Sequence, residues 1–187
     1  MSRNIVLAFT GRMASGKGSA SDFFVKKHGA QKVQFSAPLR DVLDRLYLDQ
    51  NRDNMQELSR VIRKNFGEDI LARTIIRDVA KLGAGLFVVD GARRLADIAS
   101  LRALPDFYLI AMTVPARMRY ERMTRRSENP DDRTKTWEQF QAEERAEAES
   151  LIDQLMAEAD FTIDNDCSIG EMNQRLEAMY QKIQHED

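Results

Sequence analysis

A glycine-rich stretch near the start of the sequence has the spacing of a phosphate-binding loop. It begins at Gly11, ends at Gly16 and Lys17, follows the apolar run 5–9 and precedes a segment that favours a helix. Glycine lets the backbone curve around an anion, and the following helix directs its positive dipole end toward the bound group. Lys17 adds a full charge beside the β- and γ-phosphates. The sequence therefore predicts a nucleoside triphosphate site.

One position departs from the usual pattern. Gly18 stands where Ser or Thr usually binds magnesium, and the hydroxyl group comes one residue later, at Ser19. We expect magnesium to rely on nucleotide oxygens, water, Ser19 and Asp90, which ends the apolar run 86–90 where a parallel sheet opens its ligand crevice. The predicted nucleotide-binding residues are Gly11, Ala14, Ser15, Gly16, Lys17, Gly18, Ser19 and Asn165. Asn165 could meet adenine through its amide, although its neighbours also suit an ordinary turn.

Arginines are the side chains expected around a transferring phosphoryl group, since this reaction needs positive charge and positioning more than a nucleophile. Five of them crowd positions 117–126, and on a helix Arg119, Arg122 and Arg126 share one face. Arg122 and Arg126 are the predicted phosphate donors. A solvated charged helix paired through Glu121 is the alternative.

The polar, proline-containing stretch 125–136 predicts a surface loop. Such a loop can act as a lid that excludes water, and Arg133 could then reach the bound phosphates. An exposed loop arginine can equally serve solubility alone. Together with the residues above and Arg93, which could hold an acceptor phosphate bidentately, the predicted catalytic set is Lys17, Arg93, Arg122, Arg126 and Arg133.

Five apolar runs rich in strand-forming residues alternate with helical segments, which predicts a parallel sheet with helical crossovers. The predicted strands are 5–9, 32–35, 86–90, 107–114 and 161–163. Helical periodicity predicts helices over 55–66, capped by Gly67, and over 68–82, ended by Gly83. A long helix over 137–156 has a charged middle, so only its ends are expected to pack.

Length, net charge and cysteine content narrow the possible classes of protein further. The 187 residues suit one domain, residues 1–187, around one core. A net charge of −2 provides no global field for nucleic acid. The single cysteine, Cys167, excludes an intrachain disulfide and fits a reducing cytoplasm, and no stretch has the length of a membrane span. We expect a cytoplasmic monomer or homodimer without a stable nucleic-acid or membrane partner.

Several motifs in this order resemble the P-loop nucleotide kinases of the adenylate kinase, dephospho-coenzyme A kinase and deoxynucleoside monophosphate kinase group. The ending Gly16-Lys17-Gly18-Ser19 is similar to the adenylate kinase loop, and 88–93 resembles the Asp-Gly-x-Arg that ends the third strand. The segments 110–126, 135–140 and 159–165 resemble the arginine-rich helix region, the lid exit and the last strand. The resemblance spans nearly the whole chain. It implies an α/β, three-layer P-loop NTPase fold with a five-stranded parallel sheet, a helical acceptor-side insertion at about 36–82 and a small lid at about 125–136.

The resemblance also implies a reaction. ATP with Mg²⁺ would donate the γ-phosphoryl group to a small-molecule nucleotide acceptor, a nucleoside or deoxynucleoside monophosphate. Residues 36–40 resemble the acceptor-side motif of phage-type deoxynucleotide kinases, which makes Ser36 and Arg40 candidate acceptor contacts beside Arg93. Pro38 within this motif also suits the first turn of a helix.

Two other functions stay open. A dephospho-coenzyme A kinase needs a carboxylate to take the proton of a ribose hydroxyl, yet Gln34 and Ser36 stand at the end of the second predicted strand. Asp41 and Asp44 fall within the next helix. A nucleotide-dependent ATPase switch or RNA-linked factor would use the same loop without phosphorylating an acceptor.

Overall fold

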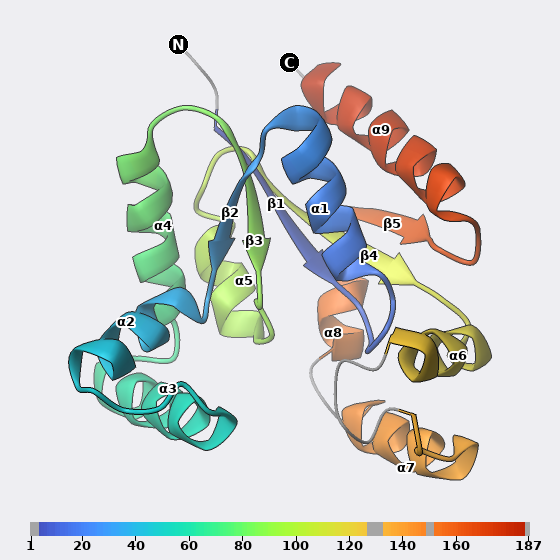
Figure 1. The fold of residues 1–187 in the computed structure, drawn as a ribbon. Coiled ribbons are helices and arrows are strands. Elements are labelled where there is room, and N and C mark those ends of the chain that lie inside the picture. Colours follow the sequence, from blue (N-terminus) through green and yellow to red (C-terminus); the bar gives the residue numbers. More distant parts are fainter. Residues whose placement is uncertain (1–3, 127–132, 149–151, 186–187) are drawn as a thin grey trace. The chain divides into compact units, whose positions relative to one another are not determined.

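A computed structural model describes residues 4–126, 133–148 and 152–185 (Figure 1). Five strands form one sheet in the order β2-β3-β1-β4-β5. They are β1 (Ile5–Thr10), β2 (Gln31–Gln34), β3 (Leu86–Asp90), β4 (Phe107–Thr113) and β5 (Phe161–Asp164). The pairs β1 with β3, β2 with β3 and β4 with β5 are parallel. All five predicted strands are confirmed, and β1, which is buried along its whole length, shows the apolar run expected of a parallel strand covered on both faces.

Helices alternate with the strands along the chain. Those in the described residues are α1 (Lys17–His28), α2 (Ala37–Arg45), α3 (Arg52–Phe66), α4 (Ile70–Leu82), α5 (Leu95–Leu101), α6 (Ala116–Arg126), α7 (Trp137–Ala148), α8 (Ile152–Ala157) and α9 (Ile169–His185). No helix in these parts of the chain is both long enough and apolar enough to cross a membrane.

The chain divides into two compact units, each described here by itself. Unit 1 comprises Met1–Ala8 and Phe24–Tyr108, and unit 2 comprises Phe9–Phe23 and Leu109–Asp187. Strands β1 and β4 contribute residues to both units.

Unit 1 contains the helices predicted for the acceptor side. Helix α4 packs on β2 and α5 through the buried side chains of Leu71, Ile75 and Val79, as its periodicity predicted. Helix α3 follows the pattern less well, since Val61 is 39% and Phe66 64% exposed while Arg63 is 5% exposed. The reason is an ion pair: Arg63 extends to the Asp97 carboxylate on α5, 2.9 Å away, and this draws a charged side chain rather than an apolar one inward.

Unit 2 corrects the packing predicted for 137–156. The described residues of this segment form α7 and α8, and residues 149–151 between them lie outside the described part of the chain. The charged middle also packs: Glu144 is half-buried because Arg12 and Arg119 both pair with its carboxylate. Phe140 is buried with Met123 in a small apolar cluster that includes Ala14.

Candidate functional site

The loop between β1 and α1 has an unusual backbone. Left-handed φ angles occur at Gly11 (141°), Ala14 (59°) and Gly16 (97°). A Cβ atom on Gly11 would lie 2.5 Å from the carbonyl oxygen of Met112, and one on Gly16 would lie 2.2 Å from Nδ2 of Asn165. Close packing and backbone conformation therefore both require glycine at these two positions. Ala14 adopts the same region without that freedom, a kind of strain that gathers at binding loops.

Lys17 opens α1 and folds its ammonium group back onto this loop. Nζ donates to the carbonyl oxygen of Gly11 at 2.6 Å and to that of Arg12 at 2.9 Å, and lies 3.4 Å from Oγ of Ser15. The backbone N–H of Ser15 donates to the Arg12 carbonyl at 3.2 Å, which closes the turn. The loop thus holds a full positive charge at its own backbone, beside the N-terminus of a helix.

The first turn of α1 carries the two residues predicted to differ from the usual magnesium pattern. Gly18 and Ser19 are both exposed. No heavy atom lies within 4 Å of a Cβ atom built on Gly18. Packing therefore does not require glycine at position 18, in contrast to position 16.

Asn165 supports the loop from the end of β5. Its Nδ2 donates to the carbonyl oxygen of Ser15 at 2.9 Å, and its backbone N–H donates to Thr113 at 2.8 Å. Arg122 on α6 donates to the Asn165 carbonyl at 2.7 Å. Asn165 is 4% exposed, so its amide serves the loop, and contact with adenine stays a prediction. Of the predicted site residues, Asn165 therefore bonds to the loop directly, and Arg122 bonds to Asn165.

The part of the chain that contains these elements matches the sequence model of a known family. The profile of the AAA domain family matches residues 10–141, which include the loop, α1 and the arginine-rich helix α6. The chain belongs to the AAA domain family. Its AAA domain match begins at the last residue of β1 and so contains the whole glycine-rich loop.

Relatives and solved structures cover nearly the whole AAA domain chain. A UPF0200 protein of Thermococcus onnurineus is 27% identical over 184 residues, which cover 96% of this chain and 98% of the relative. The crystal structure of TT1252 from Thermus thermophilus has a TM-score of 0.61 at 18% identity and covers 96% of this chain and 98% of its own. Shikimate kinase from Bacteroides thetaiotaomicron has a TM-score of 0.61 at 14% identity, with 95% and 98% covered. The predicted fold class, an α/β P-loop kinase fold, is confirmed.

The arginines of the AAA domain's α6 have different surroundings. Arg122 is half-buried and reaches the chain after β5, whereas Arg119 is 4% exposed and pairs with Glu144. Arg126 ends α6, and its side chain lies outside the described residues. Arg133 is exposed. Most of the predicted lid, 127–132, also lies outside the described residues, so the lid and the roles of Arg126 and Arg133 stay predictions.

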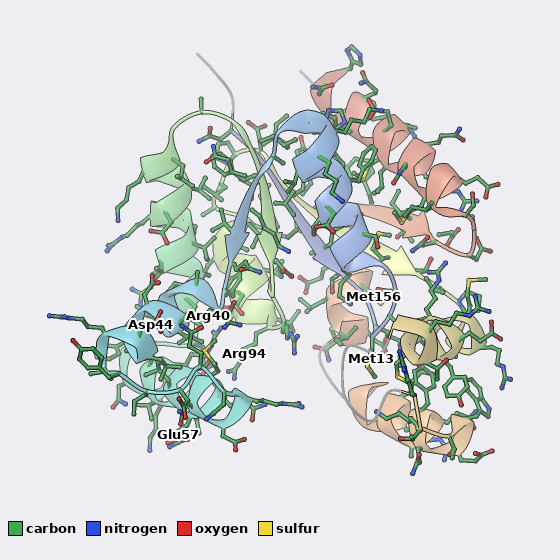
Figure 2. The ribbon with its side chains drawn as sticks, viewed as in Figure 1. Met13, Arg40, Asp44, Glu57, Arg94 and Met156 are labelled. Atoms are coloured by element: carbon green, nitrogen blue, oxygen red, sulfur yellow. The ribbon has the colours of Figure 1, made fainter. Side chains whose placement is uncertain are left out.

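The predicted acceptor residues of unit 1 lie at two places, around the start of α2 and after β3. Ser36 precedes α2 as its N-terminal cap residue. Arg40 and Asp44 lie on α2, where Gln50 links them through bonds of 2.7 and 2.5 Å (Figure 2). Arg93 is exposed between β3 and α5. Their contact with an acceptor stays a prediction.

Asp90 ends β3 and already has two neighbours. Its Oδ2 lies 3.2 Å from Nζ of Lys32 and accepts from Nε2 of Gln34 at 3.2 Å. The parallel register pairs Gln34 with Asp90, so the ends of β2 and β3 bring a carboxylate to the place where the sequence by itself shows only an amide. This neighbour of the second strand was missed because sequence order does not reveal which strands pair.

The side chains predicted to hold magnesium suit a mode of binding in which the ion keeps several of its waters. Among residues 4–126, 133–148 and 152–185, no three His, Cys, Asp or Glu side chains gather as a metal cluster. Magnesium in nucleotide sites keeps several waters and uses one or two protein groups besides phosphate oxygens. The exposed Ser19 hydroxyl of unit 2 and the Asp90 carboxylate of unit 1 each have the right chemistry for that mode of binding, and their contact with one magnesium ion stays a prediction.

Arg12 is a loop residue that the sequence pattern treats as variable. Its Nη2 donates to both Asp153 carboxylate oxygens, at 2.9 and 2.8 Å, and its Nη1 donates to the Glu144 carbonyl at 3.3 Å. These bonds tie the glycine-rich loop to α7 and α8. Sequence reasoning could have found them only through the unusual density of acidic residues after position 143.

Proposed function

We propose that this AAA-family chain is an ATP-dependent phosphotransferase that moves the γ-phosphoryl group of Mg-ATP to a nucleoside or deoxynucleoside monophosphate. The observation that carries the proposal is the Lys17 ammonium group held 2.6 Å from the Gly11 carbonyl. It lies on a loop whose two glycines cannot be replaced without a clash. A kinase-like fold supports the same class of reaction.

Lys17 is the proposed electrostatic catalyst. Its ammonium group has three N–H donors, and its contact to Ser15 Oγ at 3.4 Å is longer than its bonds to the Gly11 and Arg12 carbonyls. Exchange of that contact for a phosphate oxygen would leave the two carbonyl bonds in place to keep Nζ oriented. A donor fixed before the reaction stabilises developing charge without reorganising in the transition state.

The other proposed roles follow the predicted set. Arg122, Arg126 and Arg133 would bind the transferring phosphates, and Arg93 with Ser36 and Arg40 would hold the acceptor. Magnesium, when bound, neutralises charge on the β- and γ-phosphates, and Ser19 and Asp90 are the residues proposed to hold it.

One observation favours a second acceptor class. The Asp90 carboxylate lies beside the end of β2, where the sequence shows no carboxylate that could take the proton of a hydroxyl acceptor. Dephospho-coenzyme A carries such a hydroxyl, and so does the substrate named for the shikimate kinase of similar fold. A hydroxyl acceptor is therefore the second candidate.

A product assay distinguishes the candidates. The protein is incubated with Mg-ATP and one acceptor at a time from a panel of ribo- and deoxyribonucleoside monophosphates, dephospho-coenzyme A and shikimate, and chromatography follows ADP and phosphorylated product together. Equal amounts of ADP and a nucleoside diphosphate support the proposal. Product only with a hydroxyl acceptor supports the second candidate. ADP without any phosphorylated acceptor would contradict both and favour an ATPase switch.

A further inference from the structure

Unit 2 contains a polar cavity, wide open to solvent, beside the glycine-rich loop. Its volume is about 300 Å³, and its lining is formed by Arg12, Arg119, Gln141, Glu144 and Arg145. These side chains come from the loop, from α6 and from α7, which lie in the same unit. The volume is at the lower end of the range for small-molecule sites.

Arg119 is the buried donor of this cavity. It is 4% exposed, its Nε donates to the Val114 carbonyl at 3.0 Å, and its Nη2 donates to Glu144. Its Nη1 is buried without a hydrogen-bond partner, although the guanidinium group lies 5.6 Å over the ring of Phe140. A buried donor without a partner is costly, and such groups commonly mark a ligand or a bound water.

The charge of the lining favours an anion. Three arginines face a single carboxylate, Glu144, which Arg12 (3.5 Å) and Arg119 already share. Arg145 is exposed at the cavity, and Gln141 adds a neutral amide donor. Because the Asp153 carboxylate also pairs with Arg12, these arginines and the two carboxylates together leave one positive charge in excess, which favours an anion.

We propose that this cavity binds the phosphate group of a small anionic molecule, at a site separate from the phosphates of the nucleotide at the glycine-rich loop. Guanidinium groups donate strong, charge-assisted hydrogen bonds to phosphate oxygens, for which Arg145 supplies a whole guanidinium group and Arg119 supplies its Nη1. Glu144 acts as the resident counter-ion. Arg12 connects the two places, because its side chain lines the cavity while its carbonyl accepts from Lys17 at 2.9 Å. The site goes beyond the proposed phosphotransfer and does not depend on it.

Calorimetric titration with inorganic phosphate tests the site without any enzymatic reaction. Arg145→Gln removes an exposed cation from the lining and is expected to weaken binding about tenfold or more. Glu144→Gln removes the counter-ion and is expected to tighten binding roughly threefold or more. A merely structural role for Glu144 would not produce tighter binding. Arg117→Gln is the matched control, since Arg117 lies on α6 over the Trp137 ring and is not among the cavity residues.

Lys17→Ala separates this site from phosphate binding at the loop. Saturable binding that persists in Lys17→Ala and weakens in Arg145→Gln supports the cavity. Absence of saturable binding to the wild type would overturn the proposal, and so would binding that Lys17→Ala abolishes and Arg145→Gln leaves unchanged. Acetate titrated in parallel should bind more weakly than phosphate. Equal or tighter acetate binding would overturn the assignment to a phosphate group.

Discussion

The Lys17 ammonium group both bonds to the backbone of the loop and supplies its positive charge. The carbonyl oxygens of Gly11 and Arg12 accept from its ammonium group, so removal of that group affects both orientation and electrostatics. We expect Lys17→Ala to lower turnover roughly 10²–10³-fold, the scale for loss of one preorganised donor, with the fold intact. Steady-state kinetics and circular dichroism measure the two effects. Lys26→Ala, at an exposed position of the same helix, is the control, and turnover near wild type in Lys17→Ala would remove Lys17 from catalysis.

Arg93 is assigned to the acceptor rather than to ATP. Arg93→Ala should therefore raise the acceptor KM about tenfold, the scale for one charge-assisted contact, and leave ATP affinity unchanged. Kinetics with the acceptor and calorimetry with an ATP analogue measure these separately. Arg94→Ala is a matched control because the neighbouring Arg94 pairs with Glu68. Lost ATP affinity with an unchanged acceptor KM would show that the assignment to the acceptor side is wrong.

Gly16 and Gly18 are two glycines of one motif with opposite requirements. Gly16→Ala should destabilise the protein by about 1–3 kcal/mol, because a Cβ atom there meets Asn165 and the φ angle is left-handed. Gly18→Ala should be neutral or stabilise the protein by up to about 1 kcal/mol, because it reduces backbone entropy in open space at a helical position. Urea unfolding of both variants measures the free energies. Equal losses would contradict the difference in packing.

At the scale of elements, α9 begins with a capping box. Glu171 donates its backbone N–H to Oγ of Ser168 at 3.3 Å, and Ser168 donates to the Glu171 carboxylate from Oγ at 2.7 Å and from its N–H at 2.9 Å. These bonds fasten the start of a helix whose buried face includes Leu176 and Ile183.

The capping box gives a pH dependence. The hydrogen bonds from Ser168, side chain first and then backbone, lower the pKa of Glu171 below its ordinary 4.5. The ionised carboxylate thus stabilises the folded state above pH 4.5, and this contribution disappears as pH falls through the lowered pKa. Glu171→Gln should lower Tm at neutral pH, with a smaller difference from wild type under strong acid. Glu138→Gln, in the first turn of α7, is the control, and a difference that grows in acid would contradict the cap's role.

Helix α3 and helix α7 show why the presence of a helix was easier to predict than the face that it buries. The periodicity of α3 located the helix, but the buried bidentate pair of Arg63 and Asp97 decided its inward face. The charges of α7 indicated a solvated middle, but Glu144 found its cations on other elements. Local sequence records which residues favour a helix. It does not record which distant charge will pair with a charged side chain of that helix.

At the scale of the whole molecule, the two units share strands. Ile5–Ala8 of β1 belongs to unit 1, and the rest of β1 belongs to unit 2. Because the chain passes from one unit to the other within single strands, β1 and β4, we expect one cooperative transition, as the prediction of a single domain requires. The sole tryptophan, Trp137, lies in unit 2, and its fluorescence should change together with far-UV circular dichroism in urea. Two separate midpoints would show that the units unfold independently.

The strands, the order of helices and the glycine-rich loop all follow from the amino-acid sequence. Apolar runs of strand length cannot remain in water, and the spacing of Gly11, Gly16 and Lys17 imposes a phosphate-binding turn through local geometry. Only the tertiary structure decided that Arg119 is buried, that Arg12 reaches Asp153 and that Asp90 stands beside Gln34. These contacts join residues far apart in the chain. Their formation depends on which strands pair and which helix faces meet, and no local pattern specifies that.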